Sequence, residues 1–598
     1  MITNKVIAGF CSTVLMVMQS VQAQSIYTRQ NTTDLLNTSA AWGGTSPTGV
    51  DIAKWDATCG SNIGTALGGN VTWGQIQIAN TVTAAVTIAN TGSSTLTLNG
   101  VSSTGIDMSV ANQNLTINNP VTLGGAQTWT VASGFTLTVG NYAVDNGGNL
   151  LTIDGAGTIT LSGIYMGNGG ITKNGTGRLL LSANNTYKGA TRVNLGILDF
   201  ASANLSSMGG GNGSRDINVV AGAAVKRDTL DNTFLNRLVE TSAEITVMTG
   251  DNNTSNFDFS SSTGANLPNA FLGNWAGTGG KCEFKGVLTP ASDNYRLGGT
   301  GSKGLLGIVK TNMLTGIQGL IVGGTGSSGI RVELAAAQNF TGDTVINTGA
   351  KLTLGNNLAL QNSPLNLGST GGTFACSDGT LSQRIIGDVA APSPTFGGLK
   401  GSRDLLSAFT STGGGNEKLL VSTNVTGFSL NPGTGVTCTY SGGIANFANG
   451  TTITKTGEGT QILSGTNTYT GSTTISAGTL GLGANNMLTN SPIILTGGTL
   501  DAGTYTNSLK TLTLSGTATI NLGTGAKVVF GESRTPTWSG TLNITGNFVT
   551  GQSLRFGTTS SGLTAEQLAK IKVVGGGVAA LDANGFLKIT KGMVITFF

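Results

Sequence analysis

The stretch that decides the fold is residues 171–198, I-T-K-N-G-T-G-R-L-L-L-S-A-N-N-T-Y-K-G-A-T-R-V-N-L-G-I-L. It recurs without a gap at residues 453–480, I-T-K-T-G-E-G-T-Q-I-L-S-G-T-N-T-Y-T-G-S-T-T-I-S-A-G-T-L, and 14 of the 28 positions are identical. An internal repeat of this length indicates that the chain uses one structural unit more than once. The two copies therefore predict stacked units of short strands and turns.

A degenerate third copy spans residues 333–360 and lacks the K-x-G-x-G start. An Asn-Ser-Pro step also recurs, at residues 362–364 and 490–492. The residues expected to define the repeat are turn glycines and an Asn-aromatic corner: Gly175, Gly177, Asn185, Tyr187, Gly189 and Gly196 in the first copy; Asn339, Phe340, Gly342 and Gly349 in the degenerate copy; Gly457, Gly459, Asn467, Tyr469, Gly471 and Gly478 in the other complete copy.

Each part of the repeat has an expected structural role. Gly175 and Gly177 are expected to form a tight turn with positive φ, where a side chain would clash. Leu179 and Leu181 are two residues apart, so as strand residues they point to one face. Asn185 is expected to meet an equivalent amide in the adjacent unit and to form a ladder of side-chain hydrogen bonds.

Pairs of apolar residues at i and i+2 follow one another between residues 70 and 165 and again between 511 and 556, usually separated by Gly, Asn or Ser. Such pairs are typical of half-buried strands. Two architectures fit them: a series of β-sandwiches, or a parallel β-helix with turns of roughly 20 to 30 residues. Because no Pro-rich or charged linker divides the chain, we expect a single-stranded right-handed parallel β-helix. Some twenty turns would make a rod on the order of 100 Å long.

The composition supports an ordered protein with many short strands. The chain has 598 residues with 95 Gly, only 10 Pro and 10% charged residues, whereas disordered chains are usually rich in charge or Pro. The net charge of +4 is small for this length, and it gives no electrostatic reason to expect nucleic acid as a partner.

Residues 1–23 have the pattern of a secretory signal peptide. Lys5 precedes an apolar run, and Val21-Gln22-Ala23 has the small residues of a cleavage site, so cleavage is expected between Ala23 and Gln24. The alternatives are a transmembrane anchor, for which the run is short, and a lipoprotein at Cys11, which bulky Phe10 disfavours. The mature chain is then expected to contain no transmembrane segment.

The mature chain has four widely spaced cysteines, Cys59, Cys282, Cys376 and Cys438. An even number of cysteines in an exported chain permits disulfides, but these separations match no known framework. Isolated buried thiols are the favoured interpretation.

The remaining organisation follows from local composition. Residues 24–73 are expected to cap the first turn, residues 74–560 to form the β-helix, and residues 561–598 to cap its end with a short helix at 563–571. Residues 228–239 could form a second short helix or a loop. Residues 251–300 and 390–450 are expected to be insertions that decorate the rod.

The chain contains no histidine, which excludes Ser-His-Asp and Cys-His nucleophiles and His-ligated zinc. No cofactor or metal motif is present, so no catalytic, cofactor or metal residue is predicted. A pair of acids could still hydrolyse a polysaccharide. The densest charged cluster, Lys226, Arg227, Asp228 and Asp231 with Glu240 and Glu244, is interpreted instead as a solvated turn before a helix.

The motif K-x-G-x-G…L-S-x-x-N-x-Y-x-G-x-T-x-[VI]-x-x-G-x-L resembles the autotransporter-associated β-strand repeat, also described as the passenger-associated transport repeat. The resemblance covers about 60 residues. It implies a β-helix that is secreted or displayed at the cell surface, and members of the family are commonly adhesin-like.

Self-secreting members of this family end in a β-barrel of some 250 residues. Only 27 residues follow the predicted C-terminal helix here, so we expect other proteins to supply the secretion machinery. The sequence thus predicts an exported, non-enzymatic structural or adhesive surface protein, with extracellular glycans or cell-surface components as possible partners and the periplasm as an alternative location. The alternative function is a polysaccharide-binding or polysaccharide-degrading β-helix enzyme.

Overall fold

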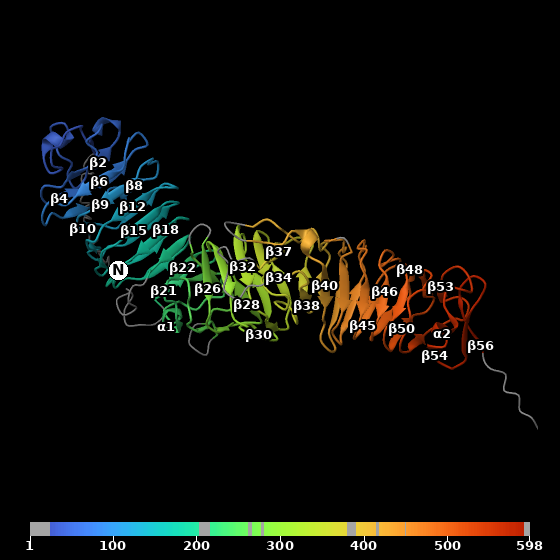
Figure 1. The fold of residues 1–598 in the computed structure, drawn as a ribbon. Helices are drawn as coiled ribbons and strands as arrows, with labels where there is room; N and C mark the ends of the chain where they lie inside the picture. Colours follow the sequence, from blue (N-terminus) through green and yellow to red (C-terminus); the bar gives the residue numbers. More distant parts are fainter. Residues whose placement is uncertain are drawn as a thin grey trace, which may run out of the picture.

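The computed structural model describes residues 24–201, 216–260, 266–276, 280–379, 390–413, 418–448 and 450–590. The described chain is a parallel β-solenoid of about 21 turns with two short α-helices. Figure 1 shows the turns stacked into a rod that changes direction near β18 (Arg178–Leu181), β21 (Ile217–Val219) and β22 (Ala224–Arg227). The predicted fold class is confirmed.

One long ladder of parallel strands runs along the whole rod, and each strand in it comes from the next turn of the chain. Its strands, in order, are β3 (Thr65–Ala66), β6 (Val86–Ala89), β9 (Leu115–Ile117), β12 (Thr136–Val139), β15 (Thr158–Leu161), β18, β20 (Ile197–Asp199), β22, β23 (Thr246–Thr249), β25 (Phe271–Asn274), β28 (Asn294–Leu297), β31 (Gly319–Val322), β34 (Thr344–Ile346), β36 (Leu365–Leu367), β39 (Leu399–Gly401), β41 (Thr437–Tyr440), β43 (Thr460–Leu463), β45 (Thr479–Leu482), β47 (Thr499–Asp501), β50 (Ala518–Leu522), β52 (Leu542–Gly546) and β54 (Ile571–Val573).

Shorter parallel sheets form the other faces of the solenoid. In the N-terminal part a nine-stranded sheet contains β1 (Ile26–Thr28), β2 (Ile52–Trp55), β5 (Gln75–Ile78), β8 (Thr104–Met108), β11 (Gln127–Val131), β14 (Leu151–Gly155), β17 (Ile171–Lys173), β19 (Thr191–Val193) and β21. Beside it a five-stranded sheet contains β4 (Val71–Trp73), β7 (Leu96–Leu98), β10 (Val121–Leu123), β13 (Val144–Asp145) and β16 (Tyr165–Met166).

The middle and C-terminal turns have corresponding sheets. A five-stranded sheet contains β26 (Lys281–Phe284), β29 (Leu305–Ile308), β32 (Ile330–Leu334), β35 (Ala350–Leu354) and β37 (Thr373–Cys376). A six-stranded sheet contains β38 (Thr395–Phe396), β40 (Gly427–Leu430), β42 (Thr452–Lys455), β44 (Thr473–Ile475), β46 (Ile493–Leu495) and β49 (Leu512–Leu514). A three-stranded sheet contains β48 (Thr506–Leu509), β51 (Lys527–Phe530) and β53 (Leu554–Phe556). Two further parallel pairs are β24 (Phe257–Asp258) with β27 (Leu288–Thr289), and β30 (Thr315–Gly316) with β33 (Asn339–Phe340). A terminal hairpin, β55 (Val578–Leu581) with β56 (Leu587–Thr590), is antiparallel.

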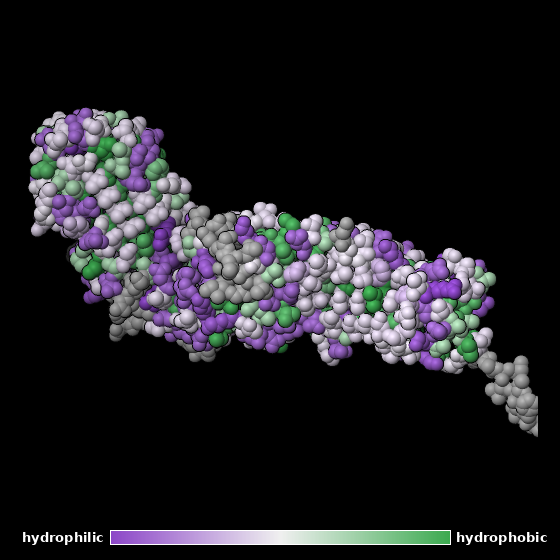
Figure 2. Space-filling view, viewed as in Figure 1, coloured by the Kyte–Doolittle hydropathy of each residue, from purple (hydrophilic) through white to green (hydrophobic). Residues whose placement is uncertain are grey.

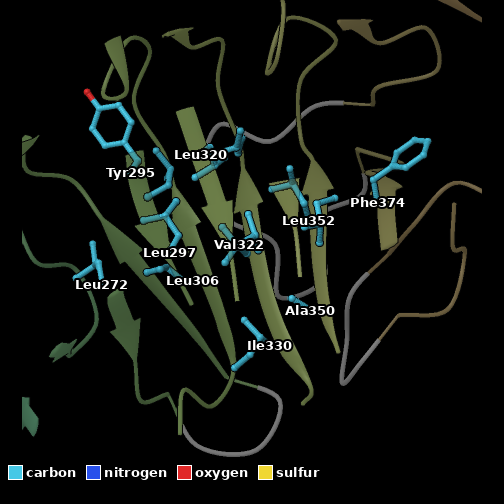
Figure 3. Close-up of a cluster of buried hydrophobic side chains, with 14 of the residues drawn as sticks. Leu272, Tyr295, Leu297, Leu306, Leu320, Val322, Ile330, Ala350, Leu352 and Phe374 are labelled. Atoms are coloured by element: carbon cyan, nitrogen blue, oxygen red, sulfur yellow. The ribbon is translucent and has the colours of Figure 1, made fainter. Parts of the chain in front are cut away.

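The core is a set of in-register apolar columns that run along the rod axis. In the long ladder Leu179 lies opposite Ile159 on one side and Leu198 on the other, and the column continues to Val225. All four side chains are at most 1% exposed. The alternating residues Arg178, Leu180 and Asp199 point away from this column, as the period of two requires. Figure 3 shows the same arrangement further along the rod, where the labelled Leu272, Leu297 and Val322 lie on successive turns.

The two α-helices are shorter than the sequence patterns suggest. Helix α2 spans Ala565–Leu568, and its N-terminus has the capping box that the sequence contains: Thr564 accepts from the Gln567 backbone nitrogen, and Gln567 accepts in return. Helix α1 spans Asn232–Leu235 and is capped by Asp231. Strand β54 begins at Ile571, so the long ladder resumes before α2 can extend.

The expectation that residues 251–300 and 390–450 are insertions is wrong. Strands β24 to β28 and β38 to β41 lie in these ranges, and they pair with strands of the turns before and after them. Their irregular sequence hides this, because several of these strands have only two residues and no alternating pattern to detect. The solenoid therefore continues through both ranges.

The predicted cap region, residues 24–73, contains β1 and β2, which are the first two strands of the nine-stranded sheet. Inside it Trp42, Trp55 and Trp73 pack edge to face, with ring centroids 5.4, 5.5 and 6.1 Å apart. All three are at most 4% exposed. The first turns are thus filled by large aromatic rings, where later turns use Leu, Ile and Val. Three short 3-10 helices complete the described elements: η1 (Ser39–Trp42), η2 (Ala57–Cys59) and η5 (Ser422–Asn424).

We predict that Leu198→Ala lowers the free energy of unfolding by about 2–5 kcal/mol, because it leaves a cavity in the continuous column. Leu150→Ala is the matched control: Leu150 is 43% exposed, and the expected loss is about 0.5 kcal/mol. Urea unfolding followed by circular dichroism measures both variants. Equal losses for the two would contradict a single shared core.

Candidate functional site

The two complete repeats place their shared asparagine in the same setting. The Asn185 side chain is buried, accepts a hydrogen bond from the backbone nitrogen of Tyr165 (2.8 Å) and donates to the carbonyl of Ala183 (2.7 Å). Asn467 accepts from Ile444 (3.1 Å) and likewise donates to the carbonyl two residues before it (3.0 Å). The expected ladder of equivalent amides is wrong, since each amide binds the backbone of the preceding turn instead. Each asparagine therefore joins two turns at a corner.

In the degenerate copy this place belongs to Gln338, not to Asn339. The Gln338 Oε1 atom accepts from the backbone nitrogen of Leu314 (3.0 Å), and its Nε2 atom donates to the carbonyl of Ala336 (3.0 Å). Asn339 is exposed. The distance to the aromatic residue would have identified the glutamine, because Gln338 precedes Phe340 by two positions, as Asn185 precedes its tyrosine.

A chain of hydroxyl groups crosses the corner of the complete copy at residues 453–480. The Tyr469 hydroxyl lies 2.7 Å from that of Thr473, which lies 2.7 Å from that of Ser491, and Ser491 donates to the carbonyl of Gly471 (2.6 Å). A hydroxyl has one proton to donate, so Thr473 must donate to Ser491 and Tyr469 to Thr473. Ser491 is the serine of the second Asn-Ser-Pro step, which explains why this step recurs.

The degenerate copy keeps the end of this chain, with Thr344 2.7 Å from Ser363 and Ser363 2.7 Å from the carbonyl of Gly342. Phe340 removes the first member. In the first copy Tyr187 lies 2.6 Å from Thr191. Burial raises the pKa of Tyr187 to about 12, and burial also raises the pKa of Tyr469. These hydroxyls are therefore neutral structural groups at physiological pH.

The lysine that opens each complete repeat is buried. Lys173 and Lys455 are at most 1% exposed, and the ammonium group of each donates to a backbone carbonyl two residues later, that of Gly175 and that of Gly457. Lys455 also donates to the carbonyl of Ala477 (3.2 Å). Burial lowers the pKa of both ammonium groups from 10.5 to about 8. The role of this lysine is to bind the carbonyls of the glycine turn from inside.

The reason predicted for the first two glycines is wrong, because neither Gly175 nor Gly177 has a positive φ. A Cβ on Gly175 would lie 2.0 Å from the carbonyl oxygen of Gly155 in the turn below, and a Cβ on Gly177 would lie 1.8 Å from that of Gly157. These glycines are needed for close contact between turns. The same applies to Gly189, Gly342, Gly457, Gly459 and Gly471, while Gly196 (φ +72°), Gly349 (+83°) and Gly478 (+58°) have both the contact and a positive φ.

The charged cluster is not a solvated turn. Lys226, 5% exposed, pairs with buried Asp199 (3.2 Å) and with Asp228. Arg227 lies 3.6 Å from Asp231. These two cations occupy the end of strand β22.

The acids of the cluster also serve the structure. Asp231 caps α1, and Glu244 accepts from the backbone nitrogen of Thr325 (2.9 Å), while Glu240 is exposed. Asp228 pairs with Lys226, and Asp231 contacts Arg227 and the backbone nitrogen of Phe234. The pairing of two acids across a cleft, which glycoside hydrolysis requires, is therefore not what this cluster provides.

A hollow of about 330 Å³ lies where the rod changes direction. We name it the bend hollow, and its lining consists of Ala156, Thr158, Thr176, Gly177, Arg178, Leu195, Gly196, Ile197, Gly222, Trp275, Thr300, Gly301 and Lys303. It exists because residues 298–304 fold back over the outer face of the long ladder. Lys303 donates from its backbone nitrogen to the carbonyl of Asn274 (2.9 Å), and Asn274 donates to the carbonyl of Lys303 (2.7 Å).

Trp275 forms one wall of the bend hollow. Its indole packs against Ile197, Ala224 and Met248, a small apolar cluster separate from the main core. The Arg178 guanidinium lies 5.1 Å and the Lys303 ammonium 4.8 Å from the indole centroid, so two cations contact one aromatic ring. No sequence pattern identified this site, because its lining joins residues of the first repeat with Trp275 and residues 300–303, which lie outside every motif.

The four cysteines of the mature chain, Cys59, Cys282, Cys376 and Cys438, are all buried and free, so isolated thiols are the correct interpretation. Burial raises the pKa of Cys282 to about 11.

Among the described residues, no group of three or more His, Cys, Asp and Glu side chains is placed to hold a metal ion. Within the same part of the chain no helix is long and apolar enough to cross a bilayer. Ala23, the residue before the expected cleavage point, lies outside the described residues, and Gln24 is exposed.

We predict that Asn467→Ala lowers the free energy of unfolding by about 1–3 kcal/mol, since it leaves the buried backbone nitrogen of Ile444 without a hydrogen-bond partner. The matched control is Asn339→Ala, in an exposed side chain, with an expected change of about 0.5 kcal/mol. Chemical unfolding of both purified variants gives the comparison. A loss at Asn339 as large as that at Asn467 would show that the corner assignment is mistaken.

We also predict a pH dependence that the buried lysines cause. In the folded chain Lys173 and Lys455 lose their protons near pH 8, whereas in the unfolded chain they keep them to about pH 10.5. Between these values the unfolded state binds more protons, so the lysines make stability rise with pH. Stability of the wild type should therefore rise relative to Lys173→Met/Lys455→Met from about pH 8 to 10.5.

Unfolding curves at several pH values test this prediction, and the difference between the two proteins cancels the opposing titration of tyrosines and cysteines. The double variant Lys510→Met/Lys527→Met, on the exposed side of the rod, serves as the control and should track the wild type. If the difference in free energy of unfolding between the wild type and Lys173→Met/Lys455→Met did not change with pH, the lowered pKa of the two lysines would be refuted.

Comparison with known proteins agrees with this geometry. A family model described as the passenger-associated-transport-repeat matches residues 171–200 and 453–482. The comparisons with curated proteins and with solved structures gave no match. The matched residues are the two stretches whose Asn, Tyr and Lys side chains have equivalent contacts and whose glycines lie equally close to the preceding turn. The chain therefore contains two passenger-associated transport repeats within a parallel β-solenoid.

Proposed function

We propose that this protein is exported and serves at the cell surface as a non-enzymatic structural or adhesive rod. The observation that carries the proposal is the combination of two passenger-associated transport repeats with one unbroken ladder along the solenoid. Repeats of this family are associated with exported passengers. A rod held by one continuous ladder suits a protein that must extend from a surface.

The outer surface supports a role in contact with other molecules over a role in chemistry. Figure 2 shows hydrophobic residues in small separate groups on the visible face, with hydrophilic residues concentrated around the middle of the rod. Four hydroxyl side chains, those of Ser407, Ser441, Thr466 and Thr468, also line a second, more open hollow of about 720 Å³, together with Asp404 and Leu406. Hydroxyl-rich surfaces of this kind form hydrogen bonds with polar ligands without ionising. We take these surfaces as the places where the rod meets its partners.

We predict that cells producing the full chain release or display a mature protein that begins at Gln24. N-terminal sequencing of the protein from the cell surface or medium, and protease treatment of intact cells, provide the measurement. Ala23→Tyr is the matched control: a bulky residue before the cleavage point should leave the chain uncleaved. Full-length protein confined to the cytoplasm, with a protease-resistant pool in intact cells, would contradict the proposal.

A further inference from the structure

The bend hollow contains the tryptophan of this chain that lies outside the core. Trp275 is partly exposed, whereas the other five, Trp42, Trp55, Trp73, Trp129 and Trp538, are at most 4% exposed. Leu195, also in the lining, is 39% exposed. Leu195, Ile197 and Trp275 together give the hollow one apolar wall. Exposed apolar side chains gathered in a concave site are typical of ligand binding.

The charge of the hollow comes from one cation without an ionic partner. Arg178 lies over the indole, but its guanidinium also donates to buried Asp199 (3.0 Å from Nε), which neutralises it. Lys303 is exposed, and within the described chain no carboxylate lies at ion-pair distance from it. The Lys303 ammonium lies over the Trp275 indole, 4.8 Å from the ring centroid. The site therefore attracts a single negative charge.

The remaining lining is neutral and polar. Thr158, Thr176 and Thr300 line it with hydroxyl groups, beside Gly177, Gly196, Gly222 and Gly301. Neutral donors and acceptors around an apolar wall match a hydroxylated ring, which has polar groups on its edge and C–H groups on its faces. A volume of about 330 Å³ is at the lower end of the range for small-ligand sites, which suits one or two sugar rings.

We propose that the bend hollow binds an acidic sugar residue of an extracellular polysaccharide, with its carboxylate against the Lys303 ammonium and its ring against the apolar wall of Leu195, Ile197 and Trp275. A uronate carries one negative charge per ring, which equals the one unpaired cation. A phosphate or nucleotide carries more charge, and the engagement of Arg178 by Asp199 disfavours it. This inference names a ligand class for the proposed adhesive function. It rests on that function in one respect, namely that the exported protein meets polysaccharide outside the cell.

The test is titration of the purified full chain with a tri-galacturonate oligosaccharide, followed by tryptophan fluorescence and by calorimetry. Because Trp275 is the partly exposed tryptophan, we expect a saturable change in fluorescence that Trp275→Phe removes. Lys303→Gln should weaken binding about tenfold or more, since it deletes a charge-assisted contact. Lys527→Gln, at an exposed lysine on strand β51, is the matched control and should bind like the wild type.

Two further ligands make the result specific. Neutral tri-galactose should bind at least about tenfold more weakly than the acidic trimer, and inorganic phosphate should not compete. Equal affinity for the neutral trimer, effective competition by phosphate, or unchanged binding by Lys303→Gln in a variant with native circular dichroism would each overturn the proposal. These measurements use purified protein, so their outcome does not depend on where the cell places the chain. The binding inference and the proposed function can therefore be refuted independently.

Discussion

The rest of the structure depends on how closely the backbone of one turn approaches the backbone of the next. Parallel ladders place successive strands about 4.8 Å apart, and the corners between strands must keep that spacing. At the corners of the repeat this leaves no room for a Cβ: an added atom on Gly177 would lie 1.8 Å from a carbonyl oxygen. In the complete repeats this spacing, and not a positive φ, requires Gly175, Gly177, Gly457 and Gly459.

Once corners are this tight, their backbone groups need partners that fit in the remaining space. Asn185 and Asn467 supply one solution by bonding the backbone of the preceding turn, and Gln338 shows that a longer amide can do the same. Lys173 and Lys455 supply another, with an ammonium group directed at the carbonyls of the glycine turn. Burying a polar group costs desolvation free energy, and hydrogen bonds offset this cost only when the group is fully bonded. The polar side chains of the repeat thus supply the hydrogen bonds that water cannot supply to the buried backbone of the corners.

Much of the fold could be predicted from the sequence, because its signals are local and repeated. The period of two, the glycine spacing and the two complete repeats identified the β-helix, and the capping box of Thr564 identified α2. The irregular turns at 251–300 and 390–450 were missed because their strands are too short to alternate. The partners of Asn185 and the reason for Gly175 were also missed, since both depend on which backbone atoms of the neighbouring turn lie opposite.

The bend hollow could not have been predicted at all. Its lining comes from a strand start at Arg178, a strand end at Trp275 and a loop at Lys303, and only the direction in which residues 298–304 fold back brings them together. That fold-back has a mechanical consequence. The ladder passes from β18 through β20 and β22 to β23 without a break, and the Trp275 cluster braces its outer side at the same level. The change of direction is accordingly a stiff elbow and not a joint, so a force applied at one end of the molecule should swing the opposite end as a lever.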